Sequence, residues 1–404
     1  MARDTTVVCL WLCLMMHLVN SECIDEGTSR NCSFLELSVI PDIIDDTVSA
    51  LDMSYNKISM VGLMDFSDKP ALTSFNLSHN LISTIHSSAF QKLSQLVVLD
   101  LSNNLLKGED LHANVFDELK QLKVLSLEGN PLKIIRQGTF DFFYLASIEN
   151  LDLSHCDIHN LEDRAIDLPR LKHLDLSWNR LQSLNPEALR MMGDLETLDL
   201  SHNDISQISV LPFLPVLNTL ILDNNGIRNV DIREAVFKSA DDVRVISLRN
   251  NEIRTFEQDQ LPWDLEVISQ IDLTNNPIEC DCKFKWIIND ENVEKKNITI
   301  ICMYPENLRG VNLMKMSENE LICRPPISKI LIITSASVAA VASITVTVFC
   351  IMALRRKRIR TKTCKDGGGD YTAIYSRGDT DETHRVNISD KKILLKDRGK
   401  EFDV

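Results

Sequence analysis

The sequence predicts an α/β-type solenoid, a curved coil of stacked turns with a parallel β-sheet on its concave side. One phrase recurs ten times between Leu51 and Ile278, for example as Leu72-x-x-Phe75-x-Leu77-x-x-Asn80-x-Ile82. Neighbouring copies lie 22 to 26 residues apart. Cysteine-containing segments flank the repeated stretch on both sides, as expected of a coil that needs capped ends.

Each phrase predicts one short strand. Its Leu-x-Leu core alternates apolar and variable residues, which is the pattern of a strand with one buried face. Because no single turn can bury its own apolar face, the turns have to stack, and their strands then form a parallel sheet. We therefore assign residues 48–279 to ten repeats.

The Asn that closes each phrase predicts a ladder of buried amides. The chain bends as it leaves the strand, and backbone groups there need partners. An Asn amide offers two donors and one acceptor oxygen, so stacked copies can satisfy these groups from turn to turn. Cys156 takes this place once, and we interpret it as a small buried thiol rather than a reactive one. The Asn positions are Asn56, Asn80, Asn104, Asn130, Asn179, Asn203, Asn225, Asn251 and Asn276.

The phrase resembles the repeat of the leucine-rich-repeat family, in which Leu and Asn recur at these offsets with a period of about 20–29 residues. This resemblance covers over half the chain. It implies a horseshoe with disulfide caps, whose concave face is the surface that such solenoids commonly use for binding.

The C-terminal cap is predicted over residues 280–324. It begins Asn276-Pro277-x-x-Cys280-x-Cys282 and is similar to the cysteine-rich cap of extracellular leucine-rich-repeat proteins. The resemblance implies the pairs Cys280–Cys302 and Cys282–Cys323, while the sequence alone leaves three connectivities open. A zinc site is the rival interpretation of Cys-x-Cys, but export and the lack of a nearby His disfavour it. We expect no metal or other cofactor.

The N-terminal cap, residues 22–47, is less regular. Cys23 and Cys32 would enclose a short loop, whereas the family usually has four cysteines here. A thinner cap and a cap completed by another chain are both open, and we favour the thinner cap.

Two apolar segments predict export and membrane anchoring. Residues 1–21 are interpreted as a secretory signal peptide, since Val7 to Val19 is apolar and small residues follow. Residues 330–354 form an uncharged run of 25 residues, long enough for one transmembrane helix. A linker over 325–329 precedes it, and the basic cluster 355–360 follows it and belongs in the cytoplasm. We expect a single-pass type I protein of the plasma membrane, with its N-terminus outside and a disordered tail over 355–404.

The net charge differs between the predicted cytoplasmic tail and the rest of the chain. The tail has 14 Lys and Arg against 9 Asp and Glu, a net charge of +5. The whole chain carries −15 and residues 1–21 carry none, so residues 22–354 carry −20. Nucleic acid and heparin-like ligands need basic surface and are disfavoured. A basic or cationic partner for this acidic part of the chain remains an open alternative.

The variable positions of the strands are the candidate ligand face. Six of the ten residues between the two Leu positions are Asp, which is either an acidic strip for a basic partner or the common wording of this repeat. We favour the second interpretation. His residues in another column could sense pH, but His is also a common filler there. The candidates are Asp100, Asp152, Asp175, Trp178, Asp199 and His202, with Trp178 as the large aromatic of its column.

Three N-glycosylation sequons begin at Asn31, Asn76 and Asn297 in the predicted extracellular part. Asn31 adjoins an expected disulfide, and Asn297 lies in the C-terminal cap. Asn76 lies on a concave strand, so a glycan there would move ligand contacts toward repeats three to nine.

The tail carries three short motifs. Tyr371 to Ile374 and Asp390 with Leu394-Leu395 resemble endocytic sorting signals that clathrin adaptors bind. Phe402 and the terminal Val404 resemble a PDZ ligand. The alternative for all three is a disordered tail with incidental matches.

The predicted span contains a row of small residues that allows a homodimer. The row is Ser335, Ala339, Ser343 and Thr347.

No catalytic motif occurs, so we expect no enzyme. The layout is similar to single-pass leucine-rich-repeat receptors and adhesion proteins. It implies a cell-surface protein that binds a protein ligand or cell-surface receptor on its concave face. The alternatives are an innate-immune co-receptor without a signalling domain, and an auxiliary subunit of a channel or receptor.

Overall fold

The computed structural model describes residues 22–41, 47–62, 71–141, 143–207, 214–229, 243–256, 269–289, 297–321 and 341–353. The chain divides into two compact units, Met1–Arg324 and Pro325–Val404. The first contains the repeats.

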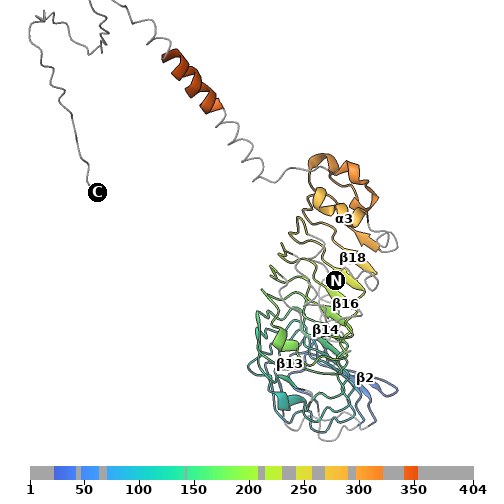
Figure 1. Cartoon of the computed structure of the whole chain (residues 1–404). Coiled ribbons are helices and arrows are strands. Elements are labelled where there is room, and N and C mark those ends of the chain that lie inside the picture. The colour runs from blue at the N-terminus through green and yellow to red at the C-terminus, as the bar shows by residue number, and fades with distance from the viewer. Residues whose placement is uncertain are drawn as a thin grey trace, which may run out of the picture. The chain divides into compact units, whose positions relative to one another are not determined.

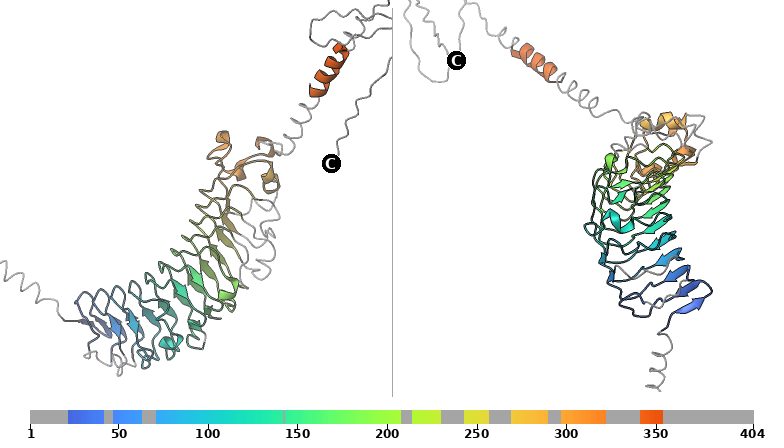
Figure 2. Two further views of the ribbon diagram at one scale, coloured as in Figure 1. Left: turned by 90° about the vertical axis from the view of Figure 1, so that its left-hand side faces the viewer. Right: turned by 90° about the horizontal axis from the view of Figure 1, so that it is seen from below.

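A 13-stranded sheet runs through the first unit (Figure 1). A strand lies at each of the ten phrases, each parallel to the next, and Figure 2 shows the coils following one another along an arc. These strands bound about nine full coils, so the predicted solenoid with its parallel sheet is confirmed. They are β3 (Ala50–Asp52), β5 (Ser74–Asn76), β7 (Val98–Asp100), β8 (Val124–Ser126), β11 (Asn150–Asp152), β14 (His173–Asp175), β15 (Thr197–Asp199), β16 (Thr219–Ile221), β17 (Val245–Ser247) and β18 (Gln270–Asp272).

The two caps extend this sheet. At the N-terminal end, β1 (Ile24–Glu26) and β2 (Ser29–Asn31) form an antiparallel hairpin, and β2 pairs in parallel with β3. At the other end, β19 (Asn297–Thr299) pairs in parallel with β18. Sequence analysis did not predict these three strands, because none of them belongs to a repeat.

The core lies inside the coil. The middle residue of each repeat strand points inward, as Phe75 and Leu99 do with no exposed surface, and its two neighbours are partly or fully exposed. Where the structure describes the back of the coil, it is built from two-residue strands and short 3-10 helices. These are β4 (Met60–Val61), β6 (Thr84–Ile85), β9 (Ile134–Ile135), β10 (Phe140–Asp141), β12 (Asn160–Leu161), β13 (Ile166–Asp167), η1 (Ala113–Phe116) and η2 (Pro186–Leu189).

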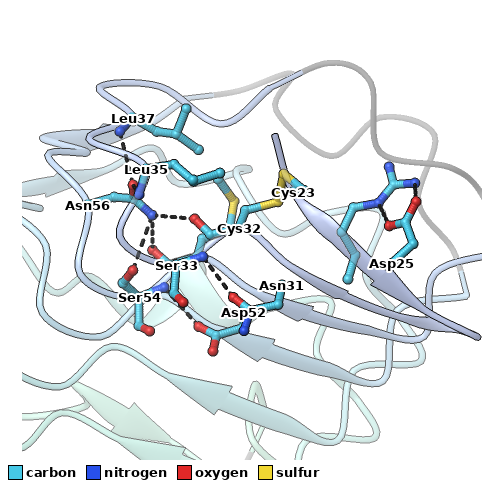
Figure 3. Close-up of a disulfide and its surroundings, with 12 residues drawn as sticks. Cys23, Asp25, Asn31, Cys32, Ser33, Leu35, Leu37, Asp52, Ser54 and Asn56 are labelled. Atoms are coloured by element: carbon cyan, nitrogen blue, oxygen red, sulfur yellow. Dashed lines mark hydrogen bonds and ion pairs between the residues drawn. A yellow bond between two sulfur atoms is a disulfide. The ribbon is translucent and has the colours of Figure 1, made fainter. Parts of the chain in front are cut away.

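The Asn column forms the expected ladder. Asn104 donates from Nδ2 to the carbonyls of Leu77 and Leu101, both at 3.0 Å, and its Oδ1 accepts from the backbone N–H of Ile82 at 2.9 Å. Each amide thus joins two neighbouring coils through backbone groups that would otherwise be buried without partners. Figure 3 shows the first member, Asn56, in the same role beside the N-terminal disulfide.

Cys156 takes the place of one Asn in this ladder and offers fewer hydrogen-bonding groups than an amide. It is buried, and its Sγ donates to the carbonyl of Leu127 at 3.1 Å. Burial raises the pKa of the thiol to about 12, so it stays protonated. A thiol offers no amide oxygen, and the N–H of Leu132 bonds instead to the carbonyl of Asn130 at 2.8 Å. The chain adapts with a left-handed residue at Lys133, whose φ is 63°.

We expect Cys156→Asn to raise the free energy of unfolding by about 1 kcal/mol, because the amide adds the donor and acceptor found in the other coils. Urea denaturation measures the change. Cys156→Ala is the matched control, since it removes the thiol without adding an amide. A Cys156→Asn protein no more stable than Cys156→Ala would contradict the expectation.

The caps contain two of the predicted disulfides, Cys23–Cys32 and Cys280–Cys302. Cys282 is also disulfide-bonded, and its predicted partner Cys323 lies outside the described residues. The rest of the C-terminal cap is short helices that cover the end of the core. They are η4 (Cys282–Phe284), α3 (Lys285–Ile288), η6 (Glu306–Leu308), η7 (Leu313–Lys315) and η8 (Glu318–Glu320).

In the second unit, residues 341–353 are helical. Within the described parts of the chain, no helix combines the length and apolarity that crossing a membrane requires. The predicted signal peptide, residues 330–340 and 354 of the predicted span, and the whole tail lie outside those parts. The tail positions concerned are Tyr371, Ile374, Asp390, Leu394, Leu395, Phe402 and Val404.

Candidate ligand-binding face

The outward-facing residue at the end of a strand is most often Asp. Asp152, Asp175 and Asp199 hold this place on three consecutive strands and lie directly opposite one another. In each, one carboxylate oxygen accepts from the backbone N–H two residues later, at 2.8–2.9 Å. The Asp therefore caps the end of its own strand. Sequence analysis assigned no such task to this column.

These carboxylates also crowd one another. Partial burial raises the pKa of Asp199, the charges of Asp175 and Asp223 raise it further, and hydrogen bonds from Ser201 oppose the shift. Ionised Asp199 thus costs folding free energy at neutral pH. The candidate Asp100 lies apart, since its neighbours across the sheet are the uncharged Asn76 and Ser126.

We expect Asp199→Asn to raise the melting temperature at neutral pH, because Asn keeps the capping oxygen and loses the charge. A raised pKa in the fold means that stability falls as pH rises from the ordinary Asp value through the folded one. The two proteins should therefore converge at pH values below the ordinary pKa of Asp. Thermal denaturation across pH measures this.

The control is Asp100→Asn. Asp100 accepts the same capping hydrogen bond from the backbone N–H two residues later, but its neighbours across the sheet are uncharged. Both substitutions create a sequon, so the proteins should be made in a bacterial periplasm, where disulfides form without N-glycans. If Asp199→Asn raised the melting temperature equally at low and neutral pH, an electrostatic cause would be contradicted.

A second column follows the rim of the sheet where the strands end. The residue before each closing Asn or Cys has a positive φ, between 52° and 71°. Gly adopts this conformation at low cost, and Asn, Asp and His adopt it more readily than other residues. Five coils use Asn or Gly, namely Asn103, Gly129, Asn224, Asn250 and Asn275. The other five have Tyr55, His79, His155, Trp178 and His202, at a cost of about 1–2 kcal/mol each.

These aromatic residues form two stacks. In the central ladder (His155, Trp178 and His202), the indole lies 5.0 Å from one imidazole and 3.7 Å from the other, with nearly parallel rings. Asn224 continues the row through a 3.1 Å contact between its Nδ2 and His202 Nε2. Trp178 is 51% exposed, and because its faces are covered, it presents its edge to solvent.

The N-terminal ladder consists of Phe34, Tyr55 and His79, with ring centroids 4.4 and 4.1 Å apart. The two ladders are separated by Asn103 and Gly129. A Cβ at Gly129 would lie 2.7 Å from Asn103 Oδ1, so a side chain there would require the Asn103 side chain to move. Sequence analysis missed Phe34, which lies in the cap and outside the repeat pattern.

The opposite rim, where the strands begin, carries alternating charges. Glu149 bridges Lys123 and Lys172 at 2.9 and 3.0 Å, and hydrogen bonds from these two lysines lower the pKa of its carboxyl. Farther along this rim lies an open groove of about 540 Å³. It is lined by Lys172, Asp194, Glu196, Thr197, Val216, Asn218 and Arg244. This rim was not predicted from the sequence, although the alternation of Lys and Glu just before successive strands could have indicated it.

Among the residues that the structure describes, no group of three or more His, Cys, Asp and Glu could hold a metal ion. The exposed aromatic edges of the central ladder lie beside the acidic column formed by Asp152, Asp175 and Asp199. Aromatic residues are enriched at protein–protein interfaces.

The model of the family described as "Leucine rich repeat" matches residues 46–106, 70–132, 146–205 and 215–278, together more than half of the chain. The chain belongs to the leucine-rich-repeat family. The resemblance inferred from the phrase is thereby confirmed.

Two leucine-rich-repeat relatives match part of the chain. Leucine-rich repeat and fibronectin type III domain-containing protein 1 of Danio rerio is 27% identical over 182 residues, 42% of this chain and 26% of that protein. CD180 antigen of Mus musculus is 31% identical over 189 residues, 44% of this chain and 27% of that protein. This chain thus spans about a quarter of the length of these relatives.

A chain from the solved octameric complex of latrophilin 3, Unc5D and FLRT2 (LRR) superimposes with a TM-score of 0.62. The two are 22% identical, and the match covers 75% of this chain and 99% of that chain. At this identity the likeness concerns the leucine-rich-repeat fold.

Proposed function

We propose that this protein is a cell-surface recognition or adhesion receptor that binds a protein partner on its central concave face. The observation that carries the proposal is the central ladder. Five other coils satisfy the same backbone conformation with Asn or Gly, so the fold does not require aromatic residues at these positions. Conformations that cost free energy cluster at functional sites, and exposed rigid aromatics are the side chains that dominate binding energy at interfaces.

The acidic column, which consists of Asp152, Asp175 and Asp199, supports the same site. Asp199 keeps its carboxylate although the fold disfavours the charge, and ionisable groups held at a cost are typical of functional sites. The acidic column and the central ladder lie on the same strands and the bends that follow them, β11 to β15. A complex that contains FLRT2 (LRR) together with two other named proteins provides a precedent for a protein partner of this fold.

The membrane anchor is part of the proposal. The disulfides fit an exported protein, and the uncharged run 330–354 followed by a basic cluster fits a single type I span. We propose that the tail engages PDZ domains through Phe402 and Val404, and clathrin adaptors through its tyrosine and dileucine motifs. The small-residue row of the span would support a homodimer.

The test displays the full-length chain on cells and probes it with a panel of soluble ectodomains of cell-surface and secreted proteins. We expect Trp178→Asn to weaken the binding of the partner by about 30-fold, the loss typical of a hot-spot residue. Asn is the residue that other coils use here, so the fold and surface level should be preserved.

Tyr55→Asn is the matched control, because it makes the same change in the N-terminal ladder. We expect its affinity to stay within about twofold of wild type, a difference of about 0.4 kcal/mol. A partner that binds wild type, Trp178→Asn and Tyr55→Asn equally well would contradict the proposed site. Binding that survives deletion of the repeats would favour an auxiliary subunit instead.

A further inference from the structure

All three extracellular sequons lie on strands of one sheet. Asn31 is on β2 and Asn76 on β5, and both lie in register with Asp52 on the strand between them. Asn297 is on β19, opposite Gln270. From the sequence, Asn297 belonged only to the cap, and its place on the sheet emerges from the pairing of β19 with β18.

The sequons at Asn76 and Asn297 project from the same face as the acidic column. Side chains alternate along a strand, and the residues next to the two asparagines, Phe75 and Ile298, are buried in the core. Asn76 and Asn297 therefore point outward on the concave side. Asn76 Oδ1 accepts from the backbone N–H of Ser78 at 2.9 Å. Its Nδ2, the atom that would carry a glycan, makes no hydrogen bond within the described part of the chain.

The stretch between these two asparagines is free of sequons. Eight strands separate β5 from β19, namely β7, β8, β11, β14, β15, β16, β17 and β18. At about 4.8 Å per strand, the free stretch is roughly 40 Å wide. Such a width accommodates the roughly 800 Å² that one partner buries in a standard interface. The central ladder, the acidic column and the groove all lie within it.

We propose that N-linked glycans on Asn76 and Asn297 bracket the concave sheet and confine the protein partner to the sector from β8 to β17. This inference rests on the proposed function in that it requires an exported chain. It deepens that function by naming two modification sites and the limits of the binding surface. Asn31 lies beyond Asn76, on β2, and is outside the bracketed region.

The test needs no partner. The full-length chain is made in cells that produce high-mannose glycans, and peptide mass analysis measures the occupancy of Asn76 and Asn297. Surface carboxylates are then coupled through a carbodiimide to a bulky amino-polyethylene glycol, before and after endoglycosidase treatment. We expect both sites to be occupied. Removal of the glycans by the endoglycosidase should increase the labelling of Asp52 severalfold and leave the labelling of Asp175 unchanged.

Two variants repeat the comparison without the enzyme. Ser78→Ala and Thr299→Val each remove one sequon and keep its Asn. Unoccupied Asn76 or Asn297 would overturn the inference, and so would an equal increase in labelling at Asp52 and Asp175 after trimming. Either result leaves the proposed function standing, because that proposal depends on the partner screen with Trp178→Asn. Loss of the proposed function would in turn leave the measured occupancy and labelling unaffected.

Discussion

Replacing Asn179 by Ala should lower the free energy of unfolding by about 3 to 5 kcal/mol, the largest effect that we expect of a single substitution in the repeats. Asn179 Nδ2 donates to the carbonyl of Leu153 at 2.8 Å, and its Oδ1 accepts from the N–H groups of Cys156 and Ile158 at 3.0 and 2.9 Å. Among the described residues, these three backbone groups make no other hydrogen bond. Each would be left buried without a partner, at about 1–3 kcal/mol apiece.

The loss should also change the shape of the transition. A solenoid is stabilised by contacts between neighbouring coils, so damage at one interface weakens the coupling of the two sides. Denaturation in urea, followed by tryptophan fluorescence and by circular dichroism, measures both effects. Asn150→Ala, on the exposed side of β11, is the matched control and should change stability by less than about 0.5 kcal/mol. A loss below about 1 kcal/mol for Asn179→Ala would contradict the role of the ladder.

Replacing Gly108 by Ala should cost about 3 kcal/mol or more, because the added methyl group has no space. A Cβ at Gly108 would lie 2.0 Å from the carbonyl oxygen of Ile134 and 2.7 Å from that of Leu132. Both atoms are backbone, so no side-chain rotation relieves the clash. This close approach adjoins the segment that rearranges where Cys156 replaces Asn, since Gly108 N–H also donates to the Leu132 carbonyl at 3.1 Å.

Gly193→Ala is the control for this prediction. The nearest atom to its Cβ would be the carbonyl oxygen of Pro169 at 3.9 Å, an ordinary contact. We expect it to be neutral, or to stabilise by up to about 1 kcal/mol through the unfolded state. Thermal and urea denaturation of both variants, with yield as a second readout, provide the comparison. Similar stabilities for the two variants would show that the coils near Gly108 can separate without cost.

Much of the fold could be predicted because the repeat is regular. Leu51 and its equivalents recur in phase, and one period fixes both the strand and the direction in which it stacks. The Asn ladder followed from the hydrogen-bonding capacity of an amide. Strands β1, β2 and β19 were not predictable in this way, because cap segments occur once and have no period to compare.

The candidate site was only partly predictable. Trp178 and His202 were identified as members of one column, but their stacking depends on a positive φ that turns each ring toward the next coil. The recurrence of Asn and Gly in that column was the signal for this conformation. The capping role of Asp175 depends on a 2.8 Å contact with its own backbone, which residue types alone do not reveal.

The capped Asp column has a genetic consequence. Asp152, Asp175 and Asp199 are each followed two residues later by Ser. Asp and Asn codons differ by one base, so a single nucleotide substitution converts any of these positions into an acceptor for an N-glycan. The amide oxygen would still cap the strand, so the protein would fold and be produced in normal amounts. If the acidic column belongs to the proposed binding face, such an allele would lose partner binding while the amount of protein stays normal.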